Sequence, residues 1–192
     1  LGLKLGLNRA PLDRPPLFLA RGVAVPSRHV EISPRIGVDS KGEIVVTAPI
    51  CFDESELRKR FPPADLWLVR SSDGGKSWTK PVRVNEVPKK AGESLHALAV
   101  APDGTAHVAW LDSRELNTNC LWYAKVEGTK PGRNQRLTGP VCECCAPGLS
   151  VDGRGNPVLV VREGKTGDRG ILLIRPPGKP ARVSPMKGGV DS

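Results

Sequence analysis

The sequence predicts an all-β protein built from repeated antiparallel units, and three observations support that prediction. Gly 21 and Pro 19 together make up about a fifth of the 192 residues, a composition typical of many turns and few long helices. Three segments, 34–48, 96–110 and 147–161, share one order: an alternating strand, a four-residue turn ending in glycine, and a strand rich in β-branched residues. No stretch keeps a sustained apolar period of about 3.6 residues.

The three hairpins are the centres of three larger units. Their turn glycines, Gly42, Gly104 and Gly155, recur at intervals of roughly 50 to 60 residues. Two more short strand-like segments follow each hairpin: 65–70 and 81–85, then 119–126 and 133–137, then 170–175 and 181–185. Four short antiparallel strands per unit at this period predict the blades of a β-propeller.

The blades are predicted at residues 31–90, 91–140 and 141–192, and residues 1–30 are an N-terminal extension or a first strand. Closed propellers contain about four to eight blades, so three blades cannot close a ring. We therefore expect missing blades, supplied by the same gene product or by a second chain.

The charge of the chain favours anionic partners. The formal net charge is +9, from 29 Lys+Arg against 20 Asp+Glu, which suits an acidic glycan or a small anion. A solvated, mildly basic surface is the alternative interpretation. Aromatic residues make up only 4% of the chain and are not interleaved with basic residues, which argues against nucleic acid. No run reaches the roughly 18 apolar residues of a membrane span.

The stretch "SSDGGKSW", residues 71–78, lies between two apolar strand-like segments and predicts a tight, clasped turn. The Asp73 side chain can accept backbone N–H bonds across the turn, and Gly75 can adopt a positive φ. The Trp78 ring can fold back and bury itself on the blade. A calcium loop is the alternative, but the other oxygen ligands of such a loop are missing.

This stretch matches the Asp-box pattern at every defined position, and over about residues 30 to 190 the chain resembles the sialidase-like, BNR-repeat β-propeller proteins. The defining residues are Ser71, Asp73, Gly75, Ser77 and Trp78. The resemblance implies part of a six-bladed propeller in which the box lies on the outer side, away from the ligand. It also implies an exported protein, periplasmic or extracellular, and an acidic glycan as the partner. A complete member would be an exo-sialidase-type glycoside hydrolase that needs no cofactor, and whether this chain is an enzyme stays open.

Candidate ligand-binding residues lie at the ends of the paired hairpin strands, where a propeller binds its ligand. The resemblance implies a set of arginines, because a guanidinium binds a carboxylate bidentately. The candidates are Arg35, Arg114, Arg162, Arg169 and His96. Each arginine could instead be a surface or ion-paired residue. Asp53 is the candidate catalytic acid. The single tyrosine, Tyr123, falls inside a predicted blade-wall strand, so we do not expect it to be a nucleophile.

The cysteines support a second hypothesis. Five cysteines favour an exported protein with disulfides. Three of them form a Cys-x-Cys-Cys cluster that could bind copper or zinc, with Cys120 or His96 completing the site. The metal-ligand candidates are Cys142, Cys144, Cys145 and Cys120. Disulfides from the cluster to Cys120 and Cys51 are the alternative. The second hypothesis is therefore a non-catalytic propeller whose cluster binds a metal or mediates a protein interaction.

Overall fold

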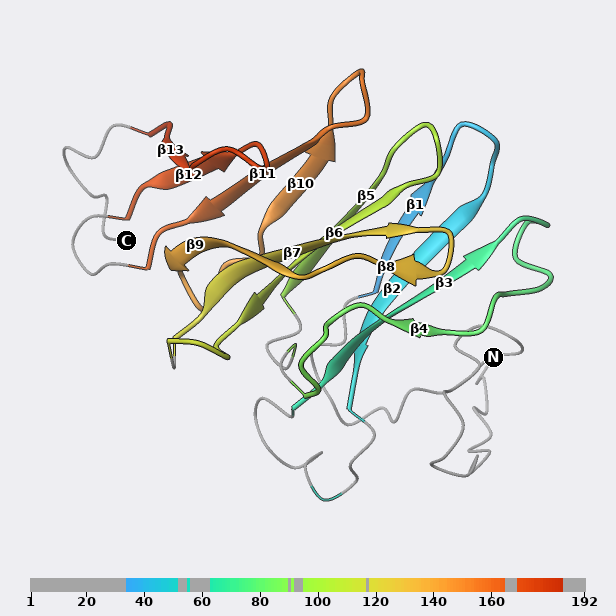
Figure 1. Ribbon diagram of the computed structural model, residues 1–192, viewed down its shortest axis with the longest axis horizontal. Coiled ribbons are helices and arrows are strands. Elements are labelled where there is room, and N and C mark those ends of the chain that lie inside the picture. The colour runs from blue at the N-terminus through green and yellow to red at the C-terminus, as the bar shows by residue number, and fades with distance from the viewer. Residues whose placement is uncertain are drawn as a thin grey trace, which may run out of the picture.

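The computed structural model describes residues 34–51, 55, 63–89, 91, 95–116, 118–164 and 169–184 (Figure 1). These residues form thirteen β-strands and no helix, so the predicted all-β class is confirmed for them. Within the same ranges, no helix of a length and apolarity suited to crossing a membrane is found. The predicted extension or first strand at residues 1–30 lies outside the described residues.

The strands form three antiparallel sheets, each from one continuous part of the chain, and the strands follow chain order except for β9, which pairs with β7. Sheet 1 contains β1 (Arg35–Val38), β2 (Ile44–Ile50), β3 (Asp65–Ser71) and β4 (Val82–Arg83). Sheet 2 contains β5 (His96–Val100), β6 (Ala106–Asp112), β7 (Cys120–Glu127), β8 (Lys130–Pro131) and β9 (Gln135–Pro140). Sheet 3 contains β10 (Gly148–Val151), β11 (Pro157–Arg162), β12 (Ile171–Ile174) and β13 (Ala181–Arg182). The described strands do not close into a barrel or a ring.

Sheet 2 corrects the prediction of four strands in every unit, because it has five. Both β8 and β9 pair with β7, β8 at Val126 and Glu127 and β9 from Cys120 to Tyr123. The register of β7 with β9 shifts between Cys120 and Trp122. The long strand β7 therefore pairs with two shorter strands, β8 and β9. In sheets 1 and 3 a single strand, β4 or β13, occupies the corresponding outer position.

The first strands of the three sheets lie side by side and run in the same direction, with β5 in contact with both β1 and β10 (Figure 1). At one end, Thr47 Oγ1 and His96 Nε2 are 3.0 Å apart. At the other end, Ser40 Oγ donates a 2.6 Å hydrogen bond to Pro102 O. We call the end where β1, β5 and β10 begin the strand-start edge, and the end with the hairpin turns 39–43, 101–105 and 152–156 the turn edge.

Sheet 2 is the middle layer and is covered on both faces, so all seven residues of β6 are buried. The face toward sheet 1 packs Val108, Trp110, Trp122, Ala124 and Val126 against Val45, Leu66, Leu68 and Val84. The face toward sheet 3 packs Ala109, Leu111, Leu121 and Tyr123 against Val141, Leu159, Val161 and Ile174. Alternation along β6 and β7 thus supplies two separate cores.

The two outer faces of the stack carry exposed apolar side chains. Gly37 of β1 faces Val100 of β5, so its neighbours Ile36 and Val38 point the other way, and they are 69% and 54% exposed. On sheet 3, Val160 lies between two residues of the inner core and is 38% exposed. Each end of the stack therefore presents β-branched side chains without a covering layer among the described residues.

The 71–78 stretch forms the turn between β3 and β4 at the turn edge. The Asp73 carboxylate accepts hydrogen bonds from the Ser71 hydroxyl at 2.8 Å and from the Ser77 backbone N–H at 2.9 Å. Gly75 has a φ of 87°, which favours glycine, and its carbonyl accepts a 3.1 Å bond from Trp78 Nε1. The hydrogen bonds, led by that from the Ser77 side chain, hold the pKa of Asp73 well below its usual range.

Candidate functional site

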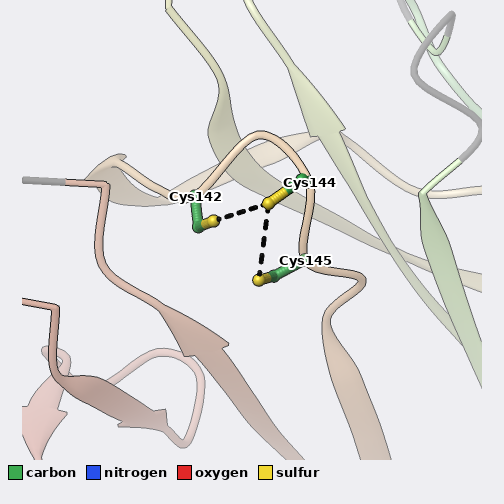
Figure 2. A group of neighbouring side chains, drawn as sticks. All are labelled: Cys142, Cys144 and Cys145. Atoms are coloured by element: carbon green, nitrogen blue, oxygen red, sulfur yellow. Dashed lines mark hydrogen bonds between the residues drawn. The ribbon is translucent and has the colours of Figure 1, made fainter. Parts of the chain in front are cut away.

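The cysteine cluster lies at the strand-start edge, in the connection from β9 to β10. Figure 2 shows the three thiols turned toward one another from a single short loop. Cys142 and Cys144 Sγ are 3.3 Å apart, Cys144 and Cys145 Sγ are 4.0 Å apart, and all three sulfurs lie within 4.8 Å of one another. Cys142 is buried, Cys145 is half-buried and Cys144 is exposed. The group could hold a metal ion.

The thiols differ in acidity because their surroundings differ. Burial raises the pKa of the Cys142 thiol, but hydrogen bonds, first from the backbone N–H of Cys144 and then from the two neighbouring thiols, outweigh burial and leave this pKa below its usual value. The same contact with Cys142, followed by that with Cys145, raises the pKa of Cys144. Of these two thiols, the buried Cys142 is therefore the more acidic and the exposed Cys144 the less acidic.

The predicted fourth ligands lie elsewhere. Cys120 begins β7, is 1% exposed, and has its Sγ 3.7 Å from Thr118 O. Burial raises the pKa of this thiol. His96 is 1% exposed and makes its 3.0 Å contact with Thr47. Neither residue belongs to the group of three thiols.

The disulfides considered from the sequence are not formed. Cys120, Cys142, Cys144 and Cys145 are all free thiols, so no bridge joins the cluster to Cys120 or to Cys51. Cys144 and Cys145 are adjacent in the chain, and a bond between adjacent cysteines would close a strained ring. The cluster is thus a set of three close thiols.

The candidate arginines fall into two groups. Arg35 begins β1 and is half-buried, and Arg162 ends β11 with Nη1 4.0 Å from Cys145 Sγ. Arg169 is exposed, just before β12. Arg35 and Arg162 occupy strand ends and lie at the strand-start edge.

Arg114 belongs to the other group, because its guanidinium is already bound. Its side chain is 8% exposed and forms an ion pair with Asp112, whose side chain is fully buried. Arg114 Nε donates to Asp112 Oδ2 over 2.7 Å, and the guanidinium carbon lies 4.1 Å from the centre of the Trp122 ring. This arrangement holds the guanidinium inside sheet 2.

Two residues considered for catalysis are placed differently. Asp53 lies outside the described residues. Tyr123 is 5% exposed, its hydroxyl is 2.7 Å from His107 Nδ1, and the two rings stack with centroids 6.0 Å apart. Burial raises the pKa of Tyr123 to about 12. A buried phenol of this kind is a core residue of sheet 2.

Some contacts around these residues could not be assigned from the sequence alone. Thr47 as the partner of His96, and the Trp122 ring beside the Arg114 guanidinium, depend on how strands come together in space. Arg70 is different, because it alternates in phase with Leu66 and Leu68 along β3, and that pattern marks it as inward-facing. It lines a groove of about 340 Å³ at the turn edge, with Asp39, Glu43, Asp103 and Glu127 among its neighbours.

Comparison with known proteins shows a likeness of fold to solved structures. No family model matches it, and no curated protein matches its sequence. The structure is similar to a fucose lectin from Kordia zhangzhouensis, with a TM-score of 0.51 and 12% identity over 81% of this chain and 100% of the lectin chain. It is also similar to the leech intramolecular trans-sialidase, with a TM-score of 0.45 and 14% identity over 75% of this chain and 22% of the enzyme.

A family 117 glycoside hydrolase from the marine bacterium Zobellia galactanivorans is similar as well, with a TM-score of 0.48 and 12% identity over 85% of this chain and 59% of the enzyme. At these identities, the likeness concerns the fold. The lectin likeness, which covers a whole chain, shows that this arrangement of antiparallel sheets is one that a carbohydrate-binding protein uses.

Proposed function

We propose that the three sheets are consecutive blades of a six-bladed, sialidase-like β-propeller, with β1, β5 and β10 nearest its axis. Three features support this: the parallel course of the first strands, the outward strand order in each sheet, and the clasped turn at 71–78. The exposed Ile36, Val38 and Val160 on the two outer faces suit contact with further blades, from the same gene product or from a second chain. The extent of the blades is proposed as 31–90, 91–140 and 141–192.

On this scaffold the proposed function is recognition of an anionic glycan at the strand-start edge. The observation that carries the proposal is the position of Arg35 and Arg162 at this edge. Among the described residues, the contacts of these two guanidinium groups are with Pro34 O and Cys145 Sγ, and neither group is paired with a carboxylate. Guanidinium forks bind carboxylates bidentately, and the net charge of +9 attracts an anionic ligand. The lectin with the same fold binds methyl-fucoside, which supports a sugar ligand.

The other candidate residues receive supporting parts in this proposal. Arg169, exposed beside β12, extends the basic surface, and Arg114 and His96 shape the edge through their bonds to Asp112 and Thr47. Asp53 would be the general acid if the complete protein hydrolyses its ligand. We propose the periplasm or the exterior of the cell as the location, because an acidic glycan would be met there.

The test measures binding of a sialylated trisaccharide and of its neutral disaccharide core by isothermal titration calorimetry. We expect the acidic sugar alone to bind, and Arg35→Ala and Arg162→Ala each to weaken binding by about 10-fold or more, as loss of a charge-assisted hydrogen bond predicts. Arg154→Ala is the matched control, because Arg154 is an exposed arginine in the turn 152–156 at the opposite edge.

Equal binding of the neutral sugar, or equal loss in the Arg154→Ala variant, would contradict the proposal. Turnover of a fluorogenic sialoside is measured in parallel, because activity lost in an Asp53→Asn variant would extend the function from binding to hydrolysis.

A further inference from the structure

The cysteine loop is a second site, separate in chemistry from sugar recognition. We propose that Cys142, Cys144 and Cys145 bind one Cu(I) ion through three thiolates at the strand-start edge. The three sulfurs come from four consecutive residues and already lie within 4.8 Å of one another (Figure 2). Thiolates are soft ligands, and soft ligands select Cu(I), zinc or iron–sulfur clusters among biological metals.

The backbone at the entry of the loop is held by hydrogen bonds, which positions the first thiol before metal binds. Val141 N donates a 2.8 Å hydrogen bond to Asn119 O, and Cys142 N donates a 2.9 Å bond to Arg162 O. Val141 also forms an antiparallel bridge with Glu163. A Cβ on Gly164 would lie 2.5 Å from Val141 O, so only glycine allows this close approach. The loop is thus fastened to β7 and β11 at its entry.

The separations of the sulfurs suit one shared ion. A metal–thiolate bond of about 2.3 Å places the sulfurs of a three-coordinate site about 4.0 Å apart. The separations of 3.3 and 4.0 Å, and the 4.8 Å limit for the whole group, bracket that value. Small side-chain rotations therefore close the site around an ion without movement of the backbone.

The number of ligands favours Cu(I) over zinc. Structural zinc sites are almost always four-coordinate and tetrahedral. Among the described residues, the group contains three potential ligands and no fourth histidine, cysteine or carboxylate. Zinc here would have to keep a water ligand. Cu(I) is satisfied by soft thiolates, and Cys142 is buried, which keeps solvent from part of the site.

An exposed thiol and a basic side chain flank the group of three sulfurs. Cys144 is exposed, so an ion can enter from solvent or from a donor protein. Three thiols that bind Cu(I) release three protons, which leaves an anionic complex. Arg162, with Nη1 4.0 Å from Cys145 Sγ, lies where it offsets part of that charge. Metal binding and sugar recognition then share an edge and the Arg162 guanidinium, but the ligand atoms of the metal are the three sulfurs alone.

The experiment uses the whole chain, reduced and kept free of oxygen, in competition with a chromophoric Cu(I) chelator. We expect one Cu(I) per chain and an X-ray absorption spectrum with three sulfur neighbours and no oxygen or nitrogen neighbour. Cys144→Ser is the main variant, because an exposed side chain contributes little packing, and Cys145→Ser is the second. Each should weaken Cu(I) binding by more than about 100-fold, beyond the 10- to 100-fold typical of changes around the ligands.

Cys120→Ala is the matched control, since Cys120 is a free thiol outside the group, and it should bind Cu(I) as the unaltered chain does. Failure to hold Cu(I) against the chelator, or equal loss in Cys120→Ala, would overturn the proposal. A four-coordinate zinc site with higher occupancy would overturn it as well. The sugar titration uses arginine variants and no metal, so the two proposals fail independently.

Discussion

Arg70 and Glu43 form an ion pair that ties the turn edge of the molecule together. Arg70 Nη1 lies 2.7 Å from Glu43 Oε2, and the Arg70 side chain is only 3% exposed. The same guanidinium donates to three backbone carbonyls, Gly104 O at 2.9 Å, Gly128 O at 2.6 Å and Val126 O at 3.1 Å. One buried cation from sheet 1 therefore joins two turns of sheet 2.

Replacement of Arg70 by methionine should destabilise the fold strongly. It removes four hydrogen bonds and leaves three carbonyls and Glu43 without their donor. The Glu43 side chain is 30% exposed and can be solvated, so most of the loss comes from the three carbonyls, each of which costs about 1–3 kcal/mol when left unsatisfied. We therefore expect the free energy of unfolding to fall by about 3 kcal/mol or more, measured by urea denaturation at neutral pH. Lys125→Met is the control, because the pair of Lys125 with Glu127 is exposed, and it should leave the unfolding midpoint unchanged. Similar effects of the two replacements would show that Arg70 is not a buried tie.

Arg114 allows a test of a structural role against a ligand-binding role. Asp112 is fully buried beside it, so Arg114→Met would leave that carboxylate without its partner, and we expect a loss of about 3–5 kcal/mol in unfolding free energy. If the pair is structural, Asp112→Asn in the same chain should recover part of this loss, because the uncompensated charge is gone. The measurement is a double-mutant cycle from urea denaturation. Strictly additive losses would mean that the two side chains do not depend on each other.

The hairpins could be predicted because their signals are local. The turn glycines Gly42, Gly104 and Gly155 have φ angles of 83°, 89° and 82°, a conformation that glycine adopts without strain, and alternation marks the strands beside them. The division of the outer strand of sheet 2 into β8 and β9 could not be predicted, because it depends on the long strand β7 opposite. The sequence pattern of residues 133–137 does not indicate that β8 and β9 both pair with β7.

The candidate site divides in the same way. Cys142, Cys144 and Cys145 are neighbours in sequence, so their closeness in space follows from the chain itself. Cys120 and His96 were predicted as further metal ligands from their residue types alone. In the structure they lie against Thr118 and Thr47 instead. The partner of Arg114 is two residues away in sequence, yet the Trp122 ring that fixes its direction comes from the next strand. Packing between strands decides such cases, and residue type alone does not.

Asp73 should make stability depend on pH in the acid range. Hydrogen bonds, first from the Ser77 side chain, lower its pKa in the folded state below the value of about 3.9 expected for the unfolded chain. The carboxylate therefore contributes stability that is present above the unfolded pKa and is lost as pH falls toward the folded pKa. Below about pH 4 the urea unfolding midpoint should decrease less steeply with falling pH in Asp73→Asn than in the unaltered chain. Ser72→Ala, in the same turn, should show the same decrease as the unaltered chain. An unchanged acid slope in Asp73→Asn would mean that the clasp does not depend on charge.

Tyr123 should resist ionisation up to the pH at which the fold itself fails. Burial raises its pKa to about 12, against about 10 for an unfolded tyrosine. Because the raised pKa belongs to the folded state, its contribution to stability is complete below about pH 10 and is lost as pH rises toward about 12. The chain has a single tyrosine, so phenolate absorbance reports this residue alone. In a titration of the native protein we expect no phenolate signal near pH 10, and in urea a full transition there. A transition near pH 10 while the circular dichroism stays native would place Tyr123 in contact with solvent, and the core between sheets 2 and 3 would then be open at that point.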